Sequence, residues 1–309
     1  MQVIRGIHNI GLAHQGCVLS IGNFDGVHKG HQKILSNLVD IARRGDHPSL
    51  VMIFEPQPKE FFHPECAPLR ITGFREKLKL IERCGIDFVI CVPFNQRFRS
   101  LSAETFVHDV LVGKLSVAHV MIGDDFRFGC DRQGSIEYLN AVKDTLGFEV
   151  SNSSTIEHQD ERISSTRIRE QLAAGNIADA NELLGWDYQI SGRIIRGDQL
   201  GRTINVPTAN IRLRHINPAL QGVVVVKVSG NGLTDHPGVA NLGPKPTVNG
   251  LRAGLEVHLL DFNGDLYGQH LTVTILKKLR SIEKFESFDL LKQQIFNDIA
   301  RARAYFNNV

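Results

Sequence analysis

The stretch from Val18 to His31 constrains the fold of this chain more than any other. The apolar run from Cys17 to Ile21 is typical of a buried central strand in a parallel sheet. Gly22 and Gly26 follow it, and glycine allows backbone angles that a side chain would block. The pattern therefore predicts a strand, a tight turn and a helix. Apolar residues then recur at helical spacing after His31: Ile34, Leu35, Leu38, Val39 and Ala42.

A glycine turn between a strand and a helix suits a phosphate group, because it gathers free backbone N–H groups at the positive end of the helix dipole. His28 and His31 lie three residues apart, so on a first helical turn they share one face. Two imidazoles placed there can donate hydrogen bonds to phosphate oxygens as charge builds in a transition state. The alternative is a structural turn with two surface histidines. The length of the string Gly-Asn-Phe-Asp-Gly-x-His-x-Gly-His favours the phosphate site.

Strands and helices alternate through the first part of the chain. Strands are expected at 50–54, 88–92 and 118–122, with helices around 74–81 and over 102–115. This order predicts a parallel sheet with helices on both faces and a ligand beyond the carboxyl ends of its strands. The proline-rich segment from Glu55 to Pro68 is predicted to be a functional loop. Within it, Phe61 and Phe62 either pack on the core or cap a ligand.

Two further segments are expected at the same edge of the sheet. One is Gly123–Gly129, where aromatic side chains can pack on a ring and an arginine can hold an anion; a polar turn with two core phenylalanines is the alternative. The other is Ile163–Arg169, whose hydroxyls predict a capped helix start, with Arg169 one turn in. An ordinary N-cap with solvated arginines is the alternative there. The candidate residues are Asp125, Phe126, Arg127, Phe128, Ser164, Ser165, Thr166 and Arg169.

The residue pattern changes near Tyr188, from alternating strands and helices to closely spaced strands. A short helix over 175–186 precedes strand-like runs at 189–195, 222–228, 255–260 and 271–276, and Asn-Gly pairs indicate hairpins. These closely spaced strands predict a small antiparallel barrel, followed by a helix from Ser287 to about Tyr305. We therefore expect two domains, residues 1–186 and 187–309.

The chemistry of the second half centres on Pro207, Thr208 and Asn210. Pro207 fixes the chain direction and holds Thr208 and Asn210 on one side, where their oxygens suit Mg²⁺. Strand alternation places Glu256 off the apolar face of Leu255 and Val257, so that its carboxylate could act as a general base. The alternatives are simple turn formers and a solvated glutamate.

Composition excludes several classes of protein. A hydrophobic content of 42%, a charged content of 22% and a net charge of +2 predict a soluble globular protein without a nucleic-acid or membrane footprint. The start of the chain is unlike a signal peptide, and the five cysteines form no Cys-x-x-Cys pair. We expect a cytoplasmic protein with reduced thiols that acts as a monomer or weak homo-oligomer.

The His-x-Gly-His element resembles the signature of the nucleotidyltransferase superfamily. The wider Gly-Asn-Phe-Asp-Gly string, together with Ile-Ser-Ser-Thr-x-Ile-Arg and Pro-Thr-Ala-Asn, resembles the bacterial bifunctional riboflavin kinase/FAD synthetase family from about residue 15 to the end. The resemblance implies an N-terminal Rossmann-like α/β domain and a C-terminal Greek-key β-barrel. It also implies ATP-binding positions at Gly22, Asn23, Phe24, Asp25, Gly26, Gly30, Ser164, Ser165, Thr166, Gly197, Gly201 and Arg202.

Members of this family phosphorylate riboflavin with ATP to give FMN, and then transfer an adenylyl group from ATP to FMN to give FAD and pyrophosphate. The resemblance implies that His28, His31 and Arg169 serve adenylyl transfer and that the 125–128 loop contacts the flavin. It implies that Glu256 is the base of the kinase reaction, and that Thr208 and Asn210 hold Mg²⁺.

Three positions depart from the family pattern. Asn205 stands where glycine is usual, Lys245 where arginine is usual and Val224 where tyrosine is common. Asn tolerates positive φ, whereas lysine loses the bidentate fork of arginine. Other hypotheses are a nucleotidyltransferase for a different phosphorylated acceptor and a flavin-storage protein without chemistry. An RNA-binding barrel is disfavoured because no basic-aromatic patch is visible.

Overall fold

The structure is a computed structural model that describes residues 1–123, 125–152, 157–158, 161–197, 204–213, 217–247 and 250–308. The chain forms two compact units. The first consists of Met1–Pro68 and Lys77–Ile163, and the second of Leu69–Glu76 and Ser164–Val309. Among the helices of the described ranges, none is long and apolar enough to cross a membrane.

The first unit is built on a parallel sheet of six strands in the order β1-β4-β3-β2-β5-β6. The direction of strand progression reverses between β2 and β5, and this topological switch point is where open α/β sheets bind ligands. The predicted parallel sheet is confirmed, with two additional edge strands, β1 and β6, that the sequence pattern did not predict. The strands are β1 (Gln2–Arg5), β2 (Val18–Ile21), β3 (Ser49–Glu55), β4 (Phe88–Pro93), β5 (His119–Ile122) and β6 (Glu149–Asn152).

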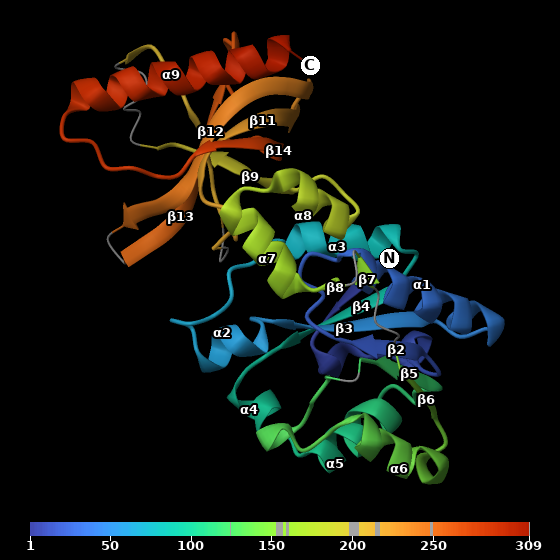
Figure 1. The fold of residues 1–309 in the computed structure, drawn as a ribbon. Helices are drawn as coiled ribbons and strands as arrows, with labels where there is room; N and C mark the ends of the chain where they lie inside the picture. The colour runs from blue at the N-terminus through green and yellow to red at the C-terminus, as the bar shows by residue number, and fades with distance from the viewer. Residues whose placement is uncertain are drawn as a thin grey trace. The chain divides into compact units, whose positions relative to one another are not determined.

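Helices cover both faces of this sheet (Figure 1). On one face, α1 buries Leu35, Leu38, Val39 and Ala42, the apolar stripe that its sequence spacing predicts. On the other, residues of the 103–112 segment and α6 pack with alternate strand residues in one core. The helices are α1 (Lys29–Arg44), α2 (Pro58–Phe62), α3 (Phe74–Arg83), α4 (Gln96–Arg99), α5 (Ala103–Thr105), a π-helical continuation (Phe106–Val112) and α6 (Ile136–Leu146).

Short elements complete the first unit. The predicted loop at 55–68 is partly wrong, because Pro58 begins the short helix α2; proline is well suited to a first helical turn. The predicted helix at 102–115 begins as expected at Ser102, whose hydroxyl accepts from the N–H of Thr105 at 3.0 Å. The remaining elements are 3₁₀ turns at Ile7–Asn9, Leu12–His14 and Cys130–Arg132 and the hairpin of β7 (Glu157–His158) with β8 (Glu161–Arg162).

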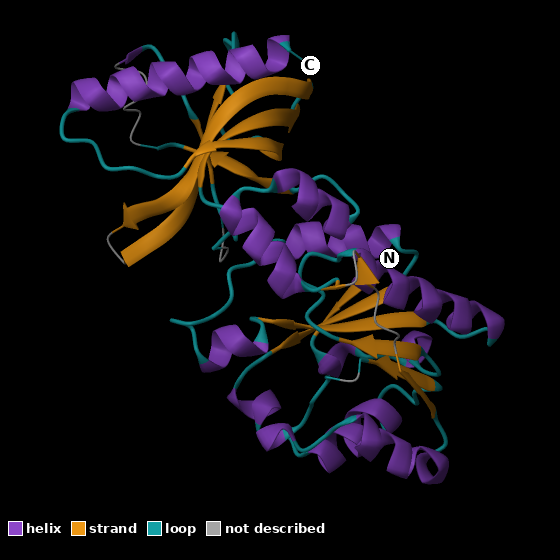
Figure 2. Ribbon diagram, in the orientation of Figure 1, coloured by secondary structure: helices purple, strands orange, loops and turns teal. Residues whose placement is uncertain are grey.

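The second unit contains a closed antiparallel barrel in the order β10-β13-β12-β11-β14-β9, drawn as strands in Figure 2. The predicted barrel is therefore confirmed. Asn231 and Gly232 form the turn between β11 and β12, as their sequence predicts, whereas Asn263-Gly264 lies in a longer connection; Asn249 is outside the described residues. The strands are β9 (Gln189–Ile195), β10 (Ala209–Ile211), β11 (Gly222–Gly230), β12 (Leu233–Thr247), β13 (Gly250–Leu259) and β14 (His270–Arg280).

Three helices and one segment from early in the sequence belong to this unit. The helices are α7 (Ser165–Ala174), α8 (Ile177–Leu184) and α9 (Phe288–Asn307). Segment Leu69–Glu76 joins the barrel through Arg70, whose N–H donates to the Asn217 carbonyl at 2.8 Å and whose carbonyl accepts from Ala219 at 3.1 Å. The compact unit therefore includes residues that the sequence analysis assigned to the first domain. The boundary at Trp186 stays a prediction.

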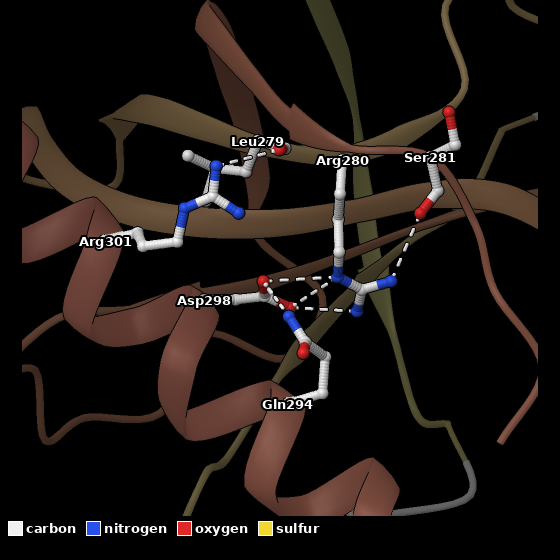
Figure 3. Close-up of polar contacts among 6 residues, drawn as sticks. All are labelled: Leu279, Arg280, Ser281, Gln294, Asp298 and Arg301. Atoms are coloured by element: carbon white, nitrogen blue, oxygen red, sulfur yellow. Dashed lines mark hydrogen bonds and ion pairs between the residues drawn. The ribbon is translucent and has the colours of Figure 1, made fainter.

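A buried ion pair holds α9 on the barrel (Figure 3). The guanidinium of Arg280, on β14, donates to both carboxylate oxygens of Asp298 at 2.8–3.2 Å, and Gln294 donates to the same carboxylate at 2.9 Å. Asp298 is 4% exposed, so its charge depends on these donors. Close by on the same helix, Ala302 packs with Val223, Val225 and Val239. The outer face of β11 is thus apolar because a helix covers it.

Candidate functional site

The loop after β2 is a tight turn of unusual backbone conformation. Phe24 and Val27 have positive φ angles of 45° and 37°, and Gly26 has φ of 85°. Side chains adopt this region rarely, and they do so where the surrounding structure compensates the strain. The N–H of Val27 donates to the Phe24 carbonyl at 3.3 Å, which closes the turn. Asp25 is 2% exposed within it.

His28 and His31 meet at the start of α1, as the sequence predicts. Their rings stack with centroids 3.7 Å apart and an interplanar angle of 19°. One detail of the prediction is wrong: His28 is the N-cap, just before the helix, and its extended backbone lets Nδ1 accept from the N–H of His31 at 3.3 Å. With Nδ1 as the acceptor, a neutral His28 carries its proton on Nε2, so that this nitrogen is a donor. The two rings therefore lie together although only one of the two residues is helical.

Gly30 explains the spacing of the His-x-Gly-His string. A Cβ at this position would lie 3.1 Å from Nδ1 and 3.2 Å from Cε1 of His28. Such contacts are tighter than most that a real side chain makes, so glycine lets the imidazole lie against the helix start. The glycine serves the placement of His28 rather than a positive φ.

The surroundings of His31 favour its neutral form. Burial lowers the pKa of His31 well below its ordinary value, and electrostatic repulsion from His28, Lys77 and Arg162 disfavours a second proton and lowers that pKa further. Its Nδ1 is buried without a hydrogen-bond partner among the described residues. A neutral imidazole with one nitrogen unengaged is able to donate to, or accept from, a bound ligand.

The loop after β5 lies beside the loop after β2, because β2 and β5 pair in parallel register with Val18 opposite His119. Phe128 is 9% exposed and belongs to the core, while Phe126 is half-buried and stacks on it with centroids 5.9 Å apart. Arg127 and Asp125 are exposed. Asp125 lies 3.7 Å from the guanidinium of Arg162. The loop thus combines one core phenylalanine, Phe128, with a half-buried one, Phe126, that packs against the core.

An aromatic cluster at the same strand ends is larger than the sequence pattern predicts. Phe94, directly after β4, contacts the rings of Phe54, Phe61, Phe62 and Phe98 at centroid distances of 5.5–5.9 Å. Phe62 is 46% exposed, and the guanidinium of Arg99 lies 5.0 Å from its ring centroid. The signal available in the sequence was a phenylalanine at or just after the ends of β3 and β4, which only the strand order brings together.

Helix α7 begins as predicted. The hydroxyl of Ser164 accepts from the N–H of Arg167 at 3.2 Å, which caps the helix. The Nε of Arg169 donates to the Leu69 carbonyl at 2.6 Å. Both interactions lie within the second compact unit. The role of Ser164, Ser165, Thr166 and Arg169 in adenylyl transfer stays a prediction.

The second candidate site is a row of polar side chains across three strands of the barrel. Glu256 on β13 pairs with Asn210 on β10 and with Asn241 on β12. Directly opposite residues in an antiparallel sheet point to the same face, with Cβ atoms about 5 Å apart. Leu255 and Val257 are buried and Glu256 is half-exposed, so the predicted alternation is confirmed. Asn241 was missed because only the strand register brings it to Glu256.

The backbone of Gly197 closes over Asn210. A Cβ at Gly197 would lie 2.5 Å from the Cγ and Nδ2 of Asn210, so this approach needs glycine. Asn210 is 9% exposed, and Asn205 has the positive φ of 58° that glycine would otherwise supply. Amide oxygens beside a carboxylate fit a hard cation such as Mg²⁺. Gly201 and Arg202, and the side chain of Lys245, lie outside the described residues.

Two families of known proteins match successive parts of the chain. The sequence profile of the FAD synthetase family matches residues 11–167, and that of the riboflavin kinase family matches residues 184–306. The bifunctional riboflavin kinase/FMN adenylyltransferase of Escherichia coli (strain K12) is 48% identical over 307 residues, covering 99% of this chain and 98% of that protein. The protein of the same name from Haemophilus influenzae is 46% identical over 309 residues, which is 100% of this chain and 100% of that protein.

A solved structure has the same fold along the whole chain. It is the crystal structure of a protein named as a macrolide-efflux protein from Streptococcus pneumoniae, with a TM-score of 0.78, 31% sequence identity, and coverage of 98% of this chain and 99% of that one. The likeness in fold therefore extends over both units. The efflux activity in that name is said of the Streptococcus protein alone, and the two family matches and the full-length relatives decide the family here.

The matches to the FAD synthetase and riboflavin kinase families, one over each part of the chain, define the class of protein as a transferase with two domains. More particularly, the chain belongs to the bifunctional riboflavin kinase/FMN adenylyltransferase family.

Proposed function

We propose that this chain makes FAD from riboflavin in two ATP-dependent steps. The observation that carries the proposal is that the FAD synthetase and riboflavin kinase families match successive parts of one chain, and that bifunctional relatives match it along its whole length. The barrel site would transfer the γ-phosphoryl group of ATP to riboflavin, giving FMN and ADP. The α/β site would join the FMN phosphate to the α-phosphate of ATP, giving FAD and pyrophosphate.

In adenylyl transfer, the FMN phosphate attacks the α-phosphorus and the bond to pyrophosphate breaks. The reaction needs no covalent enzyme intermediate, so catalysis consists of positioning and charge stabilisation. The Nε2–H of His28 would donate to a phosphoryl oxygen, since its Nδ1 is engaged by the helix start. His31, held neutral by burial and by neighbouring positive charges, would contribute a second polar contact.

The flavin ring would occupy the aromatic edge of the same sheet. Phe126 and Phe62 are the less buried members of the aromatic groups after β5 and β3. An isoalloxazine ring is flat and apolar on its faces, and offset stacking on phenylalanine suits it. Phe128 supports Phe126 from the core, Arg127 offers a guanidinium, and Asp125 lies beside it on the loop.

In the kinase step, the 5′-hydroxyl of riboflavin attacks the γ-phosphorus. Glu256 would accept the hydroxyl proton, and the amides of Asn210 and Asn241 on either side would orient the carboxylate and the substrates. Gly197 would allow the backbone to cover ATP closely. Asn210 and Thr208 would hold Mg²⁺, which neutralises phosphate charge when it is bound.

We further propose residues 1–186 and 187–309 as the functional domains, one for each reaction. All five cysteines are free thiols, which fits a reducing compartment such as the cytoplasm. We also propose that the chain acts as a monomer or weak homo-oligomer.

The test is an incubation of the purified protein with riboflavin, ATP and Mg²⁺, in which flavins are separated by chromatography over time. FMN that rises first, followed by FAD, is the expected result. FMN alone would limit the activity to the barrel. Adenylylation of a different phosphorylated acceptor, without consumption of riboflavin, would favour the first alternative, and tight flavin binding without turnover would favour a storage protein.

A further inference from the structure

Lys77 is a fully buried lysine next to the candidate adenylyl-transfer loop. It lies on α3, its exposed fraction is 0%, and its Nζ donates to the backbone carbonyl of Asn23 at 2.7 Å. Both residues belong to the first compact unit. Lysine is almost never fully buried unless it is paired, because removing the ammonium from water is costly. A lysine at this depth therefore requires an explanation, and none of the sequence motifs includes it.

The hydrogen bond fixes one peptide plane of the loop. The carbonyl of Asn23 and the N–H of Phe24 belong to the same planar trans peptide, so they point in opposite directions. When Lys77 holds the carbonyl, the Phe24 N–H is directed away from the lysine. This N–H donates to no acceptor among the described residues. Phe24 also has φ of 45°, a conformation that needs support from its surroundings.

The lysine also contributes positive charge to the histidine pair. The ring of Phe24 lies 5.1 Å from that of His31, and the charge of Lys77 is among the causes that lower the pKa of His31. The same field that disfavours a second proton on His31 attracts an anion. A phosphoryl group at the loop would thus meet an oriented N–H and a fixed positive charge behind it.

We propose that Lys77 is a positioning residue for adenylyl transfer, which fixes the Asn23–Phe24 peptide so that its N–H is presented to phosphoryl oxygens of the nucleotide and supplies charge behind them. This proposal rests on the proposed function of the α/β unit. Its action is through the loop rather than by direct contact with the substrate. The ligand class is a nucleoside triphosphate or the pyrophosphate that leaves from it.

The experiment compares three variants of the full chain: Lys77→Met, Lys77→Gln and the control Lys79→Met. Lys79 lies two residues further along the same helix and is less buried than Lys77. Rates of FAD formation from FMN and ATP are measured at saturating and limiting ATP, together with calorimetric binding of ATP and of pyrophosphate. Conversion of riboflavin to FMN by the same preparations reports the state of the barrel.

For Lys77→Met we expect kcat for FAD formation to fall about 10²-fold, the loss that a small misplacement of reacting groups can cause. Pyrophosphate binding should weaken by about 10-fold, the effect of about 1.4 kcal/mol in binding free energy. FMN formation should be unchanged, and Lys79→Met should match the wild type. Lys77→Gln keeps a donor without the charge and should recover part of kcat. It also carries the test if Lys77→Met fails to fold by circular dichroism.

Wild-type kcat and pyrophosphate affinity in a folded Lys77→Met or Lys77→Gln protein would overturn the proposal. So would a loss of activity that only follows the unfolded fraction, because a structural lysine would behave in that way. If the wild-type protein itself forms no FAD, the proposed function fails. The pyrophosphate titrations then still test whether Lys77 prepares an anion site.

Discussion

The two candidate sites are built in different ways, although we propose that both handle phosphate. In the α/β unit, the chemistry lies in loops after parallel strands, and the strained turn at Phe24 and Val27 with the His28 cap shapes it. In the barrel, the chemistry lies on the strands themselves, where Glu256 is set between two amides by the register. A parallel sheet gathers loop ends at one edge, whereas an antiparallel barrel arranges side chains in rows.

This difference has a consequence for sensitivity to mutation. A site made of consecutive loop residues depends on local backbone geometry, so small changes near His28 should affect it strongly. A site made of a cross-strand row depends on the pairing of distant segments, which the whole barrel maintains. Substitutions at each site, and at the contacts that support them, separate these two cases.

Replacement of His28 by alanine should have the largest effect. His28→Ala removes a donor to the developing phosphoryl charge, and we expect FAD formation from FMN to fall about 10³-fold. FMN formation from riboflavin should be unchanged, because the barrel does not contain this residue. Chromatographic assays of the two half-reactions measure both rates. Equal loss of both activities in a folded protein would contradict the assignment of one reaction to each site.

Replacement of Glu256 should produce the opposite pattern. Glu256→Gln keeps the shape of the side chain but removes the base, so FMN formation should fall by roughly 10²-fold or more. Added FMN should still be converted to FAD at the wild-type rate. A variant that phosphorylates riboflavin normally would exclude Glu256 as the base. The control is Asp235→Asn, which removes the charge of an exposed acidic residue elsewhere in the barrel.

A matched pair of glycine variants compares the two ways of building a site. Gly30→Ala would press on the His28 ring at 3.1 Å, and Gly197→Ala would press on Asn210 at 2.5 Å. We expect each to lower only its own half-reaction by about 10-fold, less than the roughly 10²-fold that a larger misplacement can cost. Gly11→Ala, with nothing within 4 Å, is the control. If Gly30→Ala lowered FMN formation, or Gly197→Ala lowered FAD formation, the two sites would not be independent.

The ion pair on α9 should influence stability rather than chemistry. Asp298→Ala leaves the Arg280 guanidinium, which is 14% exposed, without its carboxylate. Breaking a buried pair in this way costs about 3 kcal/mol of unfolding free energy. The midpoint temperature of thermal unfolding of the barrel should therefore fall, whereas the rate of FMN formation at low temperature should stay normal. Unchanged unfolding would show that α9 is held by the apolar contacts of Ala302 alone.

The smallest effect concerns pH. Since burial and nearby charges lower the pKa of His31, the folded protein binds fewer protons here than the unfolded chain does. The stability from this residue is therefore fully present above its ordinary pKa of 6.5 and is lost as pH falls below it. Denaturant unfolding from about pH 8 to about pH 5 should show this slope, and His31→Gln should reduce it. An imidazole resonance that titrates near 6.5 would contradict the prediction.

Much of the fold followed from local patterns. Strand-turn-helix alternation in the first part and short strands with an Asn-Gly turn in the second predicted the sheet and the barrel, and Ser102, Ser164 and Ser287 cap helices as their positions indicate. These features depend on periodicity and on hydrogen bonds between near neighbours, which sequence displays directly.

Other features were not predictable in that way. The edge strand β1 is only a few residues long, and the attachment of Leu69–Glu76 to the barrel depends on contacts with residues far along the chain. The valines of β11 are consecutive and do not alternate with polar residues. The reason is that the barrel interior buries one side of the strand and α9 buries the other. Local sequence does not state which surfaces will be covered.

The sequence by itself determined the candidate chemistry: paired histidines three residues apart, a hydroxyl-capped helix, and Thr208, Asn210 and Glu256. The tertiary structure decided which of them meet. Strand order placed the loop after β5 beside the loop after β2, strand register set Asn241 opposite Glu256, and helix packing buried Lys77 behind Asn23. The reason is that residue type and spacing fix what a side chain can do, whereas contacts between distant segments exist only once the chain has folded.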